Sequence, residues 1–343
     1  DVLLSHKATI GQTAVVPKSE FPYLMLTPQV TYYRVLDRGV LDNKFLKYYF
    51  DSPWFQKALG LWAGTGSTRA YLGITEQKNL PIIIPDIKVQ KGIVDVLSAI
   101  DEKIKLNNQI NSKLEATAKL IYDYWFVQFD FPDQNGKPYK SSGGKMVYNK
   151  DLKREIPEGW EVTQLSKIAN ITMGQSPNGS SYNFDKKGAV FFQGSTDFGD
   201  RFPKVREYTT EPSRFAKSGD ILMSVRAPVG TLNVADVDCC IGRGLAALSS
   251  KDGVFFFLLN VMTNFKKIFD SRYASGTTFG AITKPDLQSL LVVRPPRNIL
   301  KLFDKATRDF QDLINTNHRQ NLELTELRDW LLPMLMNGQV KIK

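Results

Sequence analysis

Two long stretches of regularly spaced apolar positions organise the chain. In both, core-type residues recur at alternating steps of four and three, which is a heptad seam. Neither Pro nor Gly interrupts the first seam. Each stretch predicts a helix of about 33 residues, on the order of 50 Å long at ~1.5 Å per residue. The first seam comprises Ile93, Leu97, Ile100, Ile104, Asn107, Asn111, Leu114, Ala118, Ile121 and Trp125; the second comprises Phe303, Ala306, Phe310, Leu313, Asn317, Gln320, Leu324, Leu327, Leu331 and Met334.

Amide side chains interrupt both seams at their middle. They are Asn107 and Asn111 in the first stretch, and Asn317 and Gln320 in the second. Buried amides of this kind can fix the register of a helix pair at a cost in stability. The same residues could equally line a hydrated gap at the centre of the pair. The pattern alone leaves both interpretations open.

The remaining chain alternates apolar runs with turns. β-Branched and aromatic runs predict strands at Ala14-Val-Val-Pro, Tyr23-Leu-Met-Leu and Leu80-Pro-Ile-Ile-Ile-Pro. The fold class is therefore α+β (mixed α/β). The predicted segments are a partial first domain at 1–86, a long helix at 87–126, a connecting loop or linker at 127–155, a second domain at 156–296 and a second long helix at 297–338.

An internal repeat relates the two halves. Asp1-Val-Leu-Leu-Ser-His-Lys-Ala-Thr-Ile-Gly matches Asp220-Ile-Leu-Met-Ser-Val-Arg-Ala-Pro-Val-Gly, and Ile74-Thr is matched with Ile282-Thr. By analogy with 156–219, the first repeat lacks about 60 residues at its beginning. Tandem repeats can adopt approximate two-fold symmetry, which would make the long helices antiparallel. Residues whose numbers add to 427 or 428 would then face each other, so Asn107 would meet Gln320 and Asn111 would meet Asn317.

Charge and composition narrow the possible partners. The net charge is +10 and the pI about 9.3. This charge favours a protein that binds a polyanion such as nucleic acid only slightly over a basic protein with no such partner. The two cysteines are adjacent and the two histidines are far apart, so a disulfide framework and a structural zinc site are not expected. The composition is that of a soluble globular protein, with no membrane span or signal peptide, and a reducing cytoplasm is the expected location.

Several motifs resemble the specificity subunits of type I restriction-modification systems. Gly219-Asp-Ile-Leu-Met-Ser-Val-Arg-Ala-Pro-Val-Gly and Cys240-Ile-Gly-Arg-Gly-Leu-Ala-Ala-Leu look like parts of their target recognition domain. Ile156-Pro-Glu-Gly-Trp resembles the usual entry to that domain. Ile100-Asp-Glu-Lys-Ile and Leu324-Thr-Glu-Leu-Arg-Asp-Trp-Leu-Leu-Pro resemble the two conserved helical regions. The resemblance covers the whole chain, apart from the incomplete first recognition domain.

The resemblance implies a fold and a role. Two recognition domains would be separated by two long antiparallel helices forming a coiled coil, with a pseudo-two-fold internal repeat. Each domain would read one half of a split double-stranded DNA target, and the helices would set the spacing. Two methyltransferase subunits would bind alongside, and motor-nuclease subunits would complete the complex. Such a subunit is not a catalyst and has no cofactor of its own, because S-adenosylmethionine belongs to the methyltransferase subunit.

The residues themselves offer no catalytic constellation. No Asn-Pro-Pro-Tyr or Asp-Pro-Pro-Tyr methyltransferase motif occurs, nor does a G-x-x-x-x-G-K-[ST] phosphate loop. We therefore expect no catalytic residue and no metal site. The alternatives are a structural coiled-coil scaffold, a DNA-binding protein outside restriction, and a DNA methyltransferase or nuclease in its own right.

Candidate DNA contacts follow from the chemistry of the partner. Arg, Lys, Asn and Gln read base edges, whereas Lys, Arg, Ser, Thr and backbone amides bind phosphates. Polar loops at corresponding places in the repeats supply most candidates, and Lys7 and Arg226 occupy the same repeat position; an ordinary solvated surface is the alternative for each. The first-domain candidates are Lys7, Thr9, Ser67, Thr68 and Arg69, and the second-domain candidates are Gln193, Ser195, Thr196, Arg201, Lys204, Arg206, Arg226, Arg243, Thr277, Thr278 and Lys284.

Aromatic residues gather at one end of each long helix. They are Tyr122, Tyr124, Trp125 and Phe126 in the first and Trp330 in the second. Packing against the domains is the expected primary role, and docking of the methyltransferase copies could coexist with it.

Overall fold

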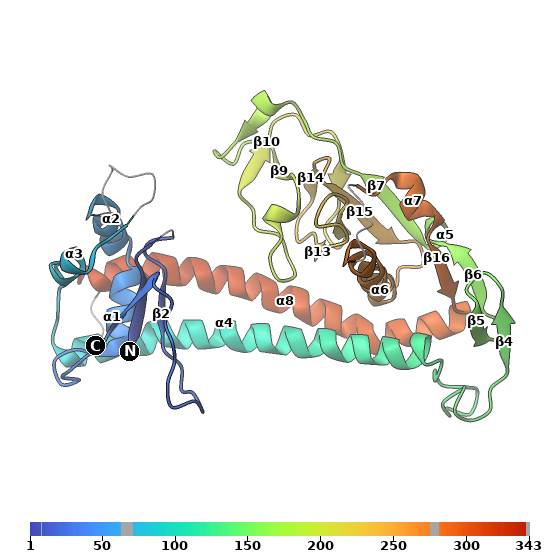
Figure 1. Cartoon of the computed structure of the whole chain (residues 1–343), viewed down its shortest axis with the longest axis horizontal. Coiled ribbons are helices and arrows are strands. Elements are labelled where there is room, and N and C mark those ends of the chain that lie inside the picture. Colours follow the sequence, from blue (N-terminus) through green and yellow to red (C-terminus); the bar gives the residue numbers. More distant parts are fainter. Residues whose placement is uncertain (8, 63–70, 275–280, 341–343) are drawn as a thin grey trace. The chain divides into compact units, whose positions relative to one another are not determined.

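The computed structural model describes residues 1–7, 9–62, 71–274 and 281–340, with backbone only at 62 and 271–274 (Figure 1). The chain forms two compact units. Unit 1 comprises Asp1–Ile110 and Thr316–Lys343, and unit 2 comprises Asn111–Asn315. Each unit thus contains a globular part and a portion of both long helices, α4 (Ile87–Tyr122) and α8 (Arg297–Met336).

Unit 1 is built on a small antiparallel sheet of order β2-β1-β3. Helix α1 begins at its N-cap Asp42, whose carboxylate accepts the amides of Lys44 and Phe45 at 2.8 and 3.0 Å. The buried face of α1 packs with Val2 and Leu4 of β1 and with Leu97 of α4 into one core. The elements are β1 (Val2–Ser5), β2 (Thr13–Val15), β3 (Val30–Tyr33), α1 (Asn43–Asp51), α2 (Pro53–Trp62) and α3 (Ile74–Lys78).

Unit 2 contains two larger sheets and two short ladders. The four-stranded antiparallel sheet has the order β13-β12-β15-β7 and the five-stranded mixed sheet the order β11-β14-β9-β10-β8. Their strands are β7 (Ala169–Met173), β8 (Tyr182–Asn183), β9 (Ala189–Phe192), β10 (Glu207–Thr209), β11 (Phe215–Ala216), β12 (Ile221–Ser224), β13 (Leu232–Val234), β14 (Cys239–Ile241) and β15 (Leu245–Ser250). The ladders pair β4 (Met146–Asn149) with β5 (Arg154–Pro157), and β6 (Glu161–Gln164) with β16 (Leu291–Arg294).

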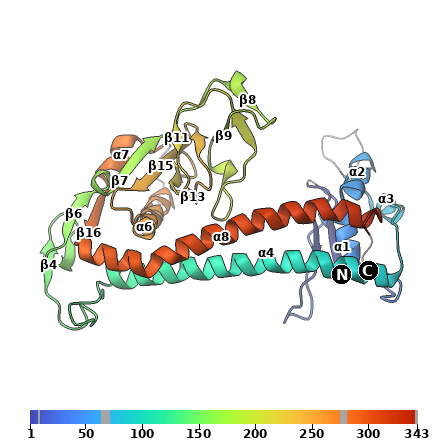
Figure 2. The same cartoon turned by 180° about the vertical axis from the view of Figure 1, so that it is seen from behind.

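The helices of unit 2 include a π-helix that continues α4. Helix α6 of this unit lies between the four-stranded sheet and the long helices (Figures 1 and 2). They are α5 (Leu165–Ile168), α6 (Phe255–Ala274), α7 (Lys284–Ser289), the π-helix η1 (Asp123–Val127) and the 3₁₀ turns η2 (Gly179–Ser181) and η3 (Ser195–Asp197).

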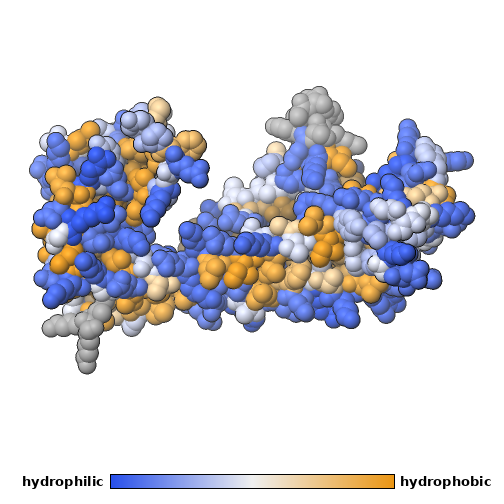
Figure 3. Space-filling model, turned by 90° about the horizontal axis from the view of Figure 1, so that it is seen from below, coloured by the Kyte–Doolittle hydropathy of each residue, from blue (hydrophilic) through white to orange (hydrophobic). Residues whose placement is uncertain are grey.

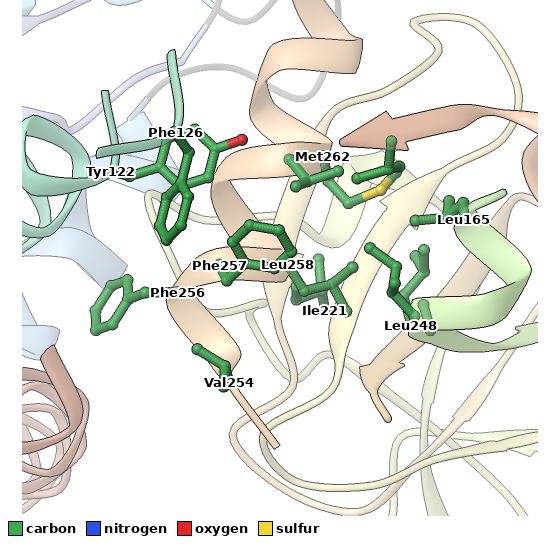
Figure 4. Packing of buried hydrophobic residues seen from close by; sticks show 14 of the residues in the cluster. Tyr122, Phe126, Leu165, Ile221, Leu248, Val254, Phe256, Phe257, Leu258 and Met262 are labelled. Atoms are coloured by element: carbon green, nitrogen blue, oxygen red, sulfur yellow. The ribbon is translucent and has the colours of Figure 1, made fainter. Parts of the chain in front are cut away.

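An aromatic cluster joins α6 to the long helices within unit 2. The Phe126 ring lies 5.1 Å from that of Phe257 and 5.0 Å from that of Phe303, centroid to centroid. Figure 4 shows Tyr122 and Phe126 beside Phe257, with Leu258 turned toward the sheet side. The aromatic cluster predicted at the end of the first helix therefore packs against the domain. In unit 1, by contrast, Trp330 is 56% exposed.

The segment 127–155 is an ordered connection rather than a flexible linker. Phe131 is buried, and its ring stacks on Tyr139 at 4.6 Å and lies 4.9 Å from the Trp160 ring. The Asp130 carboxylate accepts the Ser141 amide at 2.7 Å and its hydroxyl at 2.6 Å. These contacts fold the segment onto the entry of the second domain.

The predicted seam of the first helix is confirmed, but four of the ten positions predicted for the second are wrong. Along α4, the seam residues are buried or half-buried from Ile93 to Trp125. Along α8, the predicted Ala306, Leu313, Gln320 and Leu327 are exposed. The next residue in each case, Thr307, Ile314, Asn321 and Arg328, is buried or half-buried instead. The seam of α8 therefore steps by four and then three from Phe303, whereas the prediction began with three.

Two strands predicted in the first domain do not form. Tyr23-Leu-Met-Leu and Leu80-Pro-Ile-Ile-Ile-Pro are irregular, and most of their apolar side chains are exposed. In unit 2 the place between β13 and β15 holds β14, which pairs with β9 and β11, and the place just before the second long helix holds β16, which pairs with β6. These two strands are therefore the counterparts of the two irregular segments by their order in the repeat. No strand among the described residues of unit 1 pairs with either segment, and a strand needs a partner for its backbone groups. Apolar residues consequently reach the surface of unit 1, at the left of Figure 3.

Candidate nucleic-acid interface

The same tight turn follows the first repeat strand in both units. Gly230 donates its amide to the Ser224 carbonyl at 2.8 Å, and Gly11 does the same to Ser5 at 3.0 Å. Both glycines have positive φ, +84° and +91°. The Ser224 hydroxyl accepts the Thr231 amide at 2.9 Å, and the Ser5 hydroxyl accepts that of Gln12 at the same distance. The structure thereby supports the predicted internal repeat at the level of single hydrogen bonds.

Lys7 and Arg226 occupy equivalent, exposed places on these turns. Lys7 forms an isolated bridge with Tyr71, and Arg226 forms one with Ala281. The Lys7 ammonium lies 5.1 Å from the centre of the Tyr71 ring. Tyr71 and Ala281 directly follow the two polar loops. Ser67, Thr68, Arg69, Thr277 and Thr278, which are the candidates in those loops, lie outside the described residues.

Backbone bonds correct one part of the repeat alignment. The Leu72 amide donates to His6 O at 3.1 Å, and the Ile282 amide donates to Val225 O at 2.9 Å. Leu72 therefore corresponds to Ile282, and the predicted match of Ile74 with Ile282 is wrong by two residues. The Ile-Thr dipeptide that occurs at both places in the sequence accounts for the incorrect match.

Lys284 is the first residue of the short helix α7 and is exposed. Thr283 caps this helix, and Asp286 completes the capping box by accepting the Thr283 amide at 2.9 Å. The hydroxyl and amide of Thr283 lower the pKa of the Asp286 carboxyl. The box fixes the start of α7.

A second group of candidates surrounds the buried carboxylate of Asp197. Its Oδ2 accepts the Gln193 amide at 3.0 Å, and its Oδ1 accepts Nε of Arg206 at 3.1 Å. The Lys204 amide donates to the Asp197 carbonyl at 2.7 Å. Hydrogen bonding and charge from Asp197 raise the pKa of the exposed Arg206 guanidinium. Sequence reasoning missed Asp197, because an acidic residue is not itself a typical contact for DNA.

Arg243 lies next to this group. It sits on the exposed turn between β14 and β15, and the Gly242 amide donates to Phe192 O at 2.9 Å. A Cβ on Gly244 would lie 2.7 Å from Gln193 O, so the glycine permits a close approach of the two backbones. Tertiary structure thus brings Gln193 and Arg243 together at the C-terminal ends of the neighbouring parallel strands β9 and β14. Ser195, which begins η3 and is half-buried, and the exposed Thr196 belong to the same loop as Gln193. Thr9, on the first-domain turn, is also exposed.

Arg201 is placed differently from the other candidates. Its side chain is 11% exposed and ion-pairs with Glu115 of α4. Nη2 also donates to Gln311 Oε1 of α8 at 2.6 Å. Burial lowers the pKa of the guanidinium to about 10, so it remains charged at neutral pH. These contacts argue against the predicted role of Arg201 in contacting DNA, because its guanidinium is taken up by a carboxylate and an amide within the protein.

An amide network joins the long helices inside unit 1. Asn107 is fully buried, and its Nδ2 donates to Gln320 Oε1 and to Asn321 Oδ1, both at 2.8 Å. Asn321 Nδ2 donates in turn to Asn108 Oδ1 at 2.8 Å. The predicted contact of Asn107 with Gln320 is present, although the residue on the seam of α8 opposite Asn107 is Asn321 rather than Gln320. The match of Asn111 with Asn317 stays a prediction, because these residues belong to different units.

Comparison with known proteins decides the family. A protein-family model described as the type I restriction modification DNA specificity domain matches residues 1–116 and 157–325. The chain belongs to this family. The resemblance to type I restriction-modification specificity subunits is therefore confirmed, and with it the role of a non-catalytic specificity component in DNA recognition.

Individual relatives agree with the family. A Methanocaldococcus jannaschii protein that carries the name MjaX specificity subunit of a type I restriction enzyme is 34% identical over 355 residues, covering all of this chain and 79% of that protein. The MjaIX specificity subunit of the same organism is 26% identical, covering all of this chain and 78% of that protein. A solved S subunit from M. genitalium shares the fold, with a TM-score of 0.53 at 15% identity, over 97% of this chain and 82% of that one.

Two structural properties accompany this assignment. Among residues 1–7, 9–62, 71–274 and 281–340, no group of three or more His, Cys, Asp or Glu could hold a metal ion. Within the same part of the chain, no helix is both long and apolar enough to cross a bilayer.

Proposed function

We propose that this specificity subunit reads a split DNA target, with one half contacted by each globular part. The single observation that carries the proposal is the duplicated turn, which presents Lys7 in one unit and Arg226 in the other in the same bonding pattern. Phosphate contact at a shared position accounts for a cation in both repeats. In the second half, Gln193 and Arg243 are the proposed base-reading side chains.

DNA binding that falls steeply with salt would test this proposal. Each phosphate contact contributes a slope of about −0.9 in the logarithmic salt dependence of the binding constant. Gel shifts should be run over a range of salt concentrations, with and without the methyltransferase subunit. No binding at low salt, even with that subunit present, would refute the proposal. Methyl transfer from labelled S-adenosylmethionine by the isolated chain would instead favour an enzyme.

The division into recognition domains at 1–86 and 156–296, with helices at 87–126 and 297–338, belongs to the same proposal. We propose that the helices act as a ruler between the half-sites. The amide network at Asn107 supports a fixed register in unit 1. One heptad inserted at matching places in both helices should lengthen the unread spacer of the target. Methylome mapping in cells carrying the intact system would measure that spacer, and an unchanged site would contradict the ruler.

We further propose that two methyltransferase subunits dock on the long helices, that motor-nuclease subunits join for restriction, and that the complex works in the cytoplasm. Leu120 and Trp330 support two equivalent docking places. They lie at the same repeat position, 210 residues apart, and are 69% and 56% exposed. Tryptophan is enriched among the residues that anchor protein interfaces, and an exposed leucine supplies apolar area that docking would bury. Leu120→Ser and Trp330→Ser should each remove one methyltransferase copy, which the mass of the purified complex would report.

A further inference from the structure

The excursion from 193 to 206, between β9 and β10, carries most of the second-domain candidates and also Arg201. Among the candidates on this excursion, all of which the structure describes, Arg201 is the one whose charged group is buried in the protein. Its guanidinium bonds to Glu115 on α4 and to Gln311 on α8, and it lies 5.4 to 5.9 Å from the rings of Phe202, Phe255 and Phe256. All these residues belong to unit 2. One side chain therefore links the excursion to both long helices.

Backbone bonds transmit this attachment along the excursion. The Val234 amide donates to the Arg201 carbonyl at 2.8 Å, and Asn233 Nδ2 donates to the Gly199 carbonyl at 2.9 Å. The Lys204 amide donates a hydrogen bond to the Asp197 carbonyl. Asp197 in turn holds the Gln193 amide and the Arg206 side chain, as described above. Hydrogen bonds at successive points thus connect the excursion to the long helices, to β13 and, through Asp197, to the backbone of Gln193 and the side chain of Arg206.

We propose that Arg201 is a positioning residue that fixes the 193–206 excursion on the helix pair and so sets the sequence selectivity of the second half-site. The inference rests on the proposed function, because it concerns the side chains assigned there to DNA. The planar guanidinium suits this place, since its separate nitrogens reach a carboxylate on one helix and an amide on the other.

Glu115 and Gln311 offer a matched pair of test variants. Glu115→Gln removes the carboxylate but retains its shape. The double change Glu115→Gln with Gln311→Glu returns one carboxylate and one amide to Arg201, with the helices exchanged. Arg201→Lys keeps the charge but loses the planar fork, and it should behave like Glu115→Gln. A residue that only needs a charged partner for stability would tolerate lysine.

Hydrogen exchange in the full chain provides a readout that needs no DNA. In Glu115→Gln, the amides of Gln193 and Lys204 should exchange roughly 10- to 100-fold faster, the range expected when one charge-assisted hydrogen bond is lost. Amides of the central strand pair, such as Leu222 and Ala247, should keep their wild-type rates. The double variant should return the excursion to within about threefold of wild type. Unchanged exchange in Glu115→Gln, or an equal change in the central strands, would overturn the positioning role.

Measurements of DNA binding distinguish the positioning role of Arg201 from the proposed reading of a split DNA target. The target obtained by methylome mapping should be compared with DNA altered only in its second half-site. Glu115→Gln should lose about tenfold of that preference, comparable to one mismatched base pair, and the double variant should regain it. Altered exchange with unaltered preference would leave the excursion positioned by Arg201 but would remove it from DNA reading. Restored exchange with restored preference supports both.

Discussion

Replacement of Asn107 by Leu should stabilise the helix pair of unit 1. Asn107 is fully buried and donates two hydrogen bonds through Nδ2, whereas its Oδ1 is buried without a partner. Leu removes that unsatisfied acceptor, a gain of ~1–3 kcal/mol, and gives up two bonds that contribute about 1 kcal/mol each. Burying the Leu side chain adds roughly 1.5–3 kcal/mol. Gln320 is exposed, so water can satisfy the oxygen that it leaves free.

The expected net effect is about 1–3 kcal/mol of additional stability. Asn107→Ala is the matched control, because it loses the same bonds and leaves a space instead of a packed side chain; it should be destabilised by about 1–2 kcal/mol. Urea unfolding followed by circular dichroism would order the three proteins as Leu, wild type and Ala. A Leu variant less stable than wild type by more than about 1 kcal/mol would refute the reasoning, because the amide network would then contribute more than its bonds.

Three other changes test separate parts of the structure. Asp130→Asn should lower the free energy of unfolding by about 1–2 kcal/mol at neutral pH. Hydrogen bonds from Ser141 lower the pKa of the Asp130 carboxyl below 3.8, so the stability advantage of the wild type should be full above pH 4 and disappear as the pH falls through the lowered folded-state pKa. Urea midpoints at pH 7 and pH 3 would show this, and an equal difference at both pH values would contradict it. Arg226→Ala should reduce the salt slope of DNA binding by about one, whereas Lys301→Ala on α8 should leave it unchanged, and equal slopes for both variants would argue against a phosphate contact at Arg226. Phe126→Ala should destabilise unit 2 by about 3–5 kcal/mol, measured by thermal unfolding, and a loss below about 1 kcal/mol would mean that the aromatic cluster repacks.

Sequence patterns located the long helices and the repeat but misplaced part of the seam. Leu313 and Ile314 are adjacent and both apolar, so either could have faced the partner helix. The structure buries Ile314 and leaves Leu313 44% exposed. Heptad spacing defines a helix face only to within a residue when both neighbouring rows are apolar, and the packed partner settles the choice.

The strands at Tyr23-Leu-Met-Leu and Leu80-Pro-Ile-Ile-Ile-Pro show a second limit. Their composition is that of strands, and their counterparts in unit 2 are strands. β-Propensity, however, measures how well a segment fits a sheet, so it cannot supply the neighbouring strand. The local pattern therefore showed that these segments can form strands, but it could not show whether a neighbouring strand is present for them to pair with.

By itself, the sequence determined the order of domains and helices, the antiparallel register through Asn107 and Gln320, and the shared turn that carries Lys7 and Arg226. Each of these depends on periodicity or on local repetition, which a chain displays along its length. Only the tertiary structure decided that Arg201 is buried between two helices and that Asp197 organises the residues around it. Arg201 and Glu115 are 86 positions apart, and no local pattern reveals which distant carboxylate will neutralise a charge. Only the tertiary structure therefore distinguishes Arg201, which positions the excursion, from the arginines proposed to contact DNA.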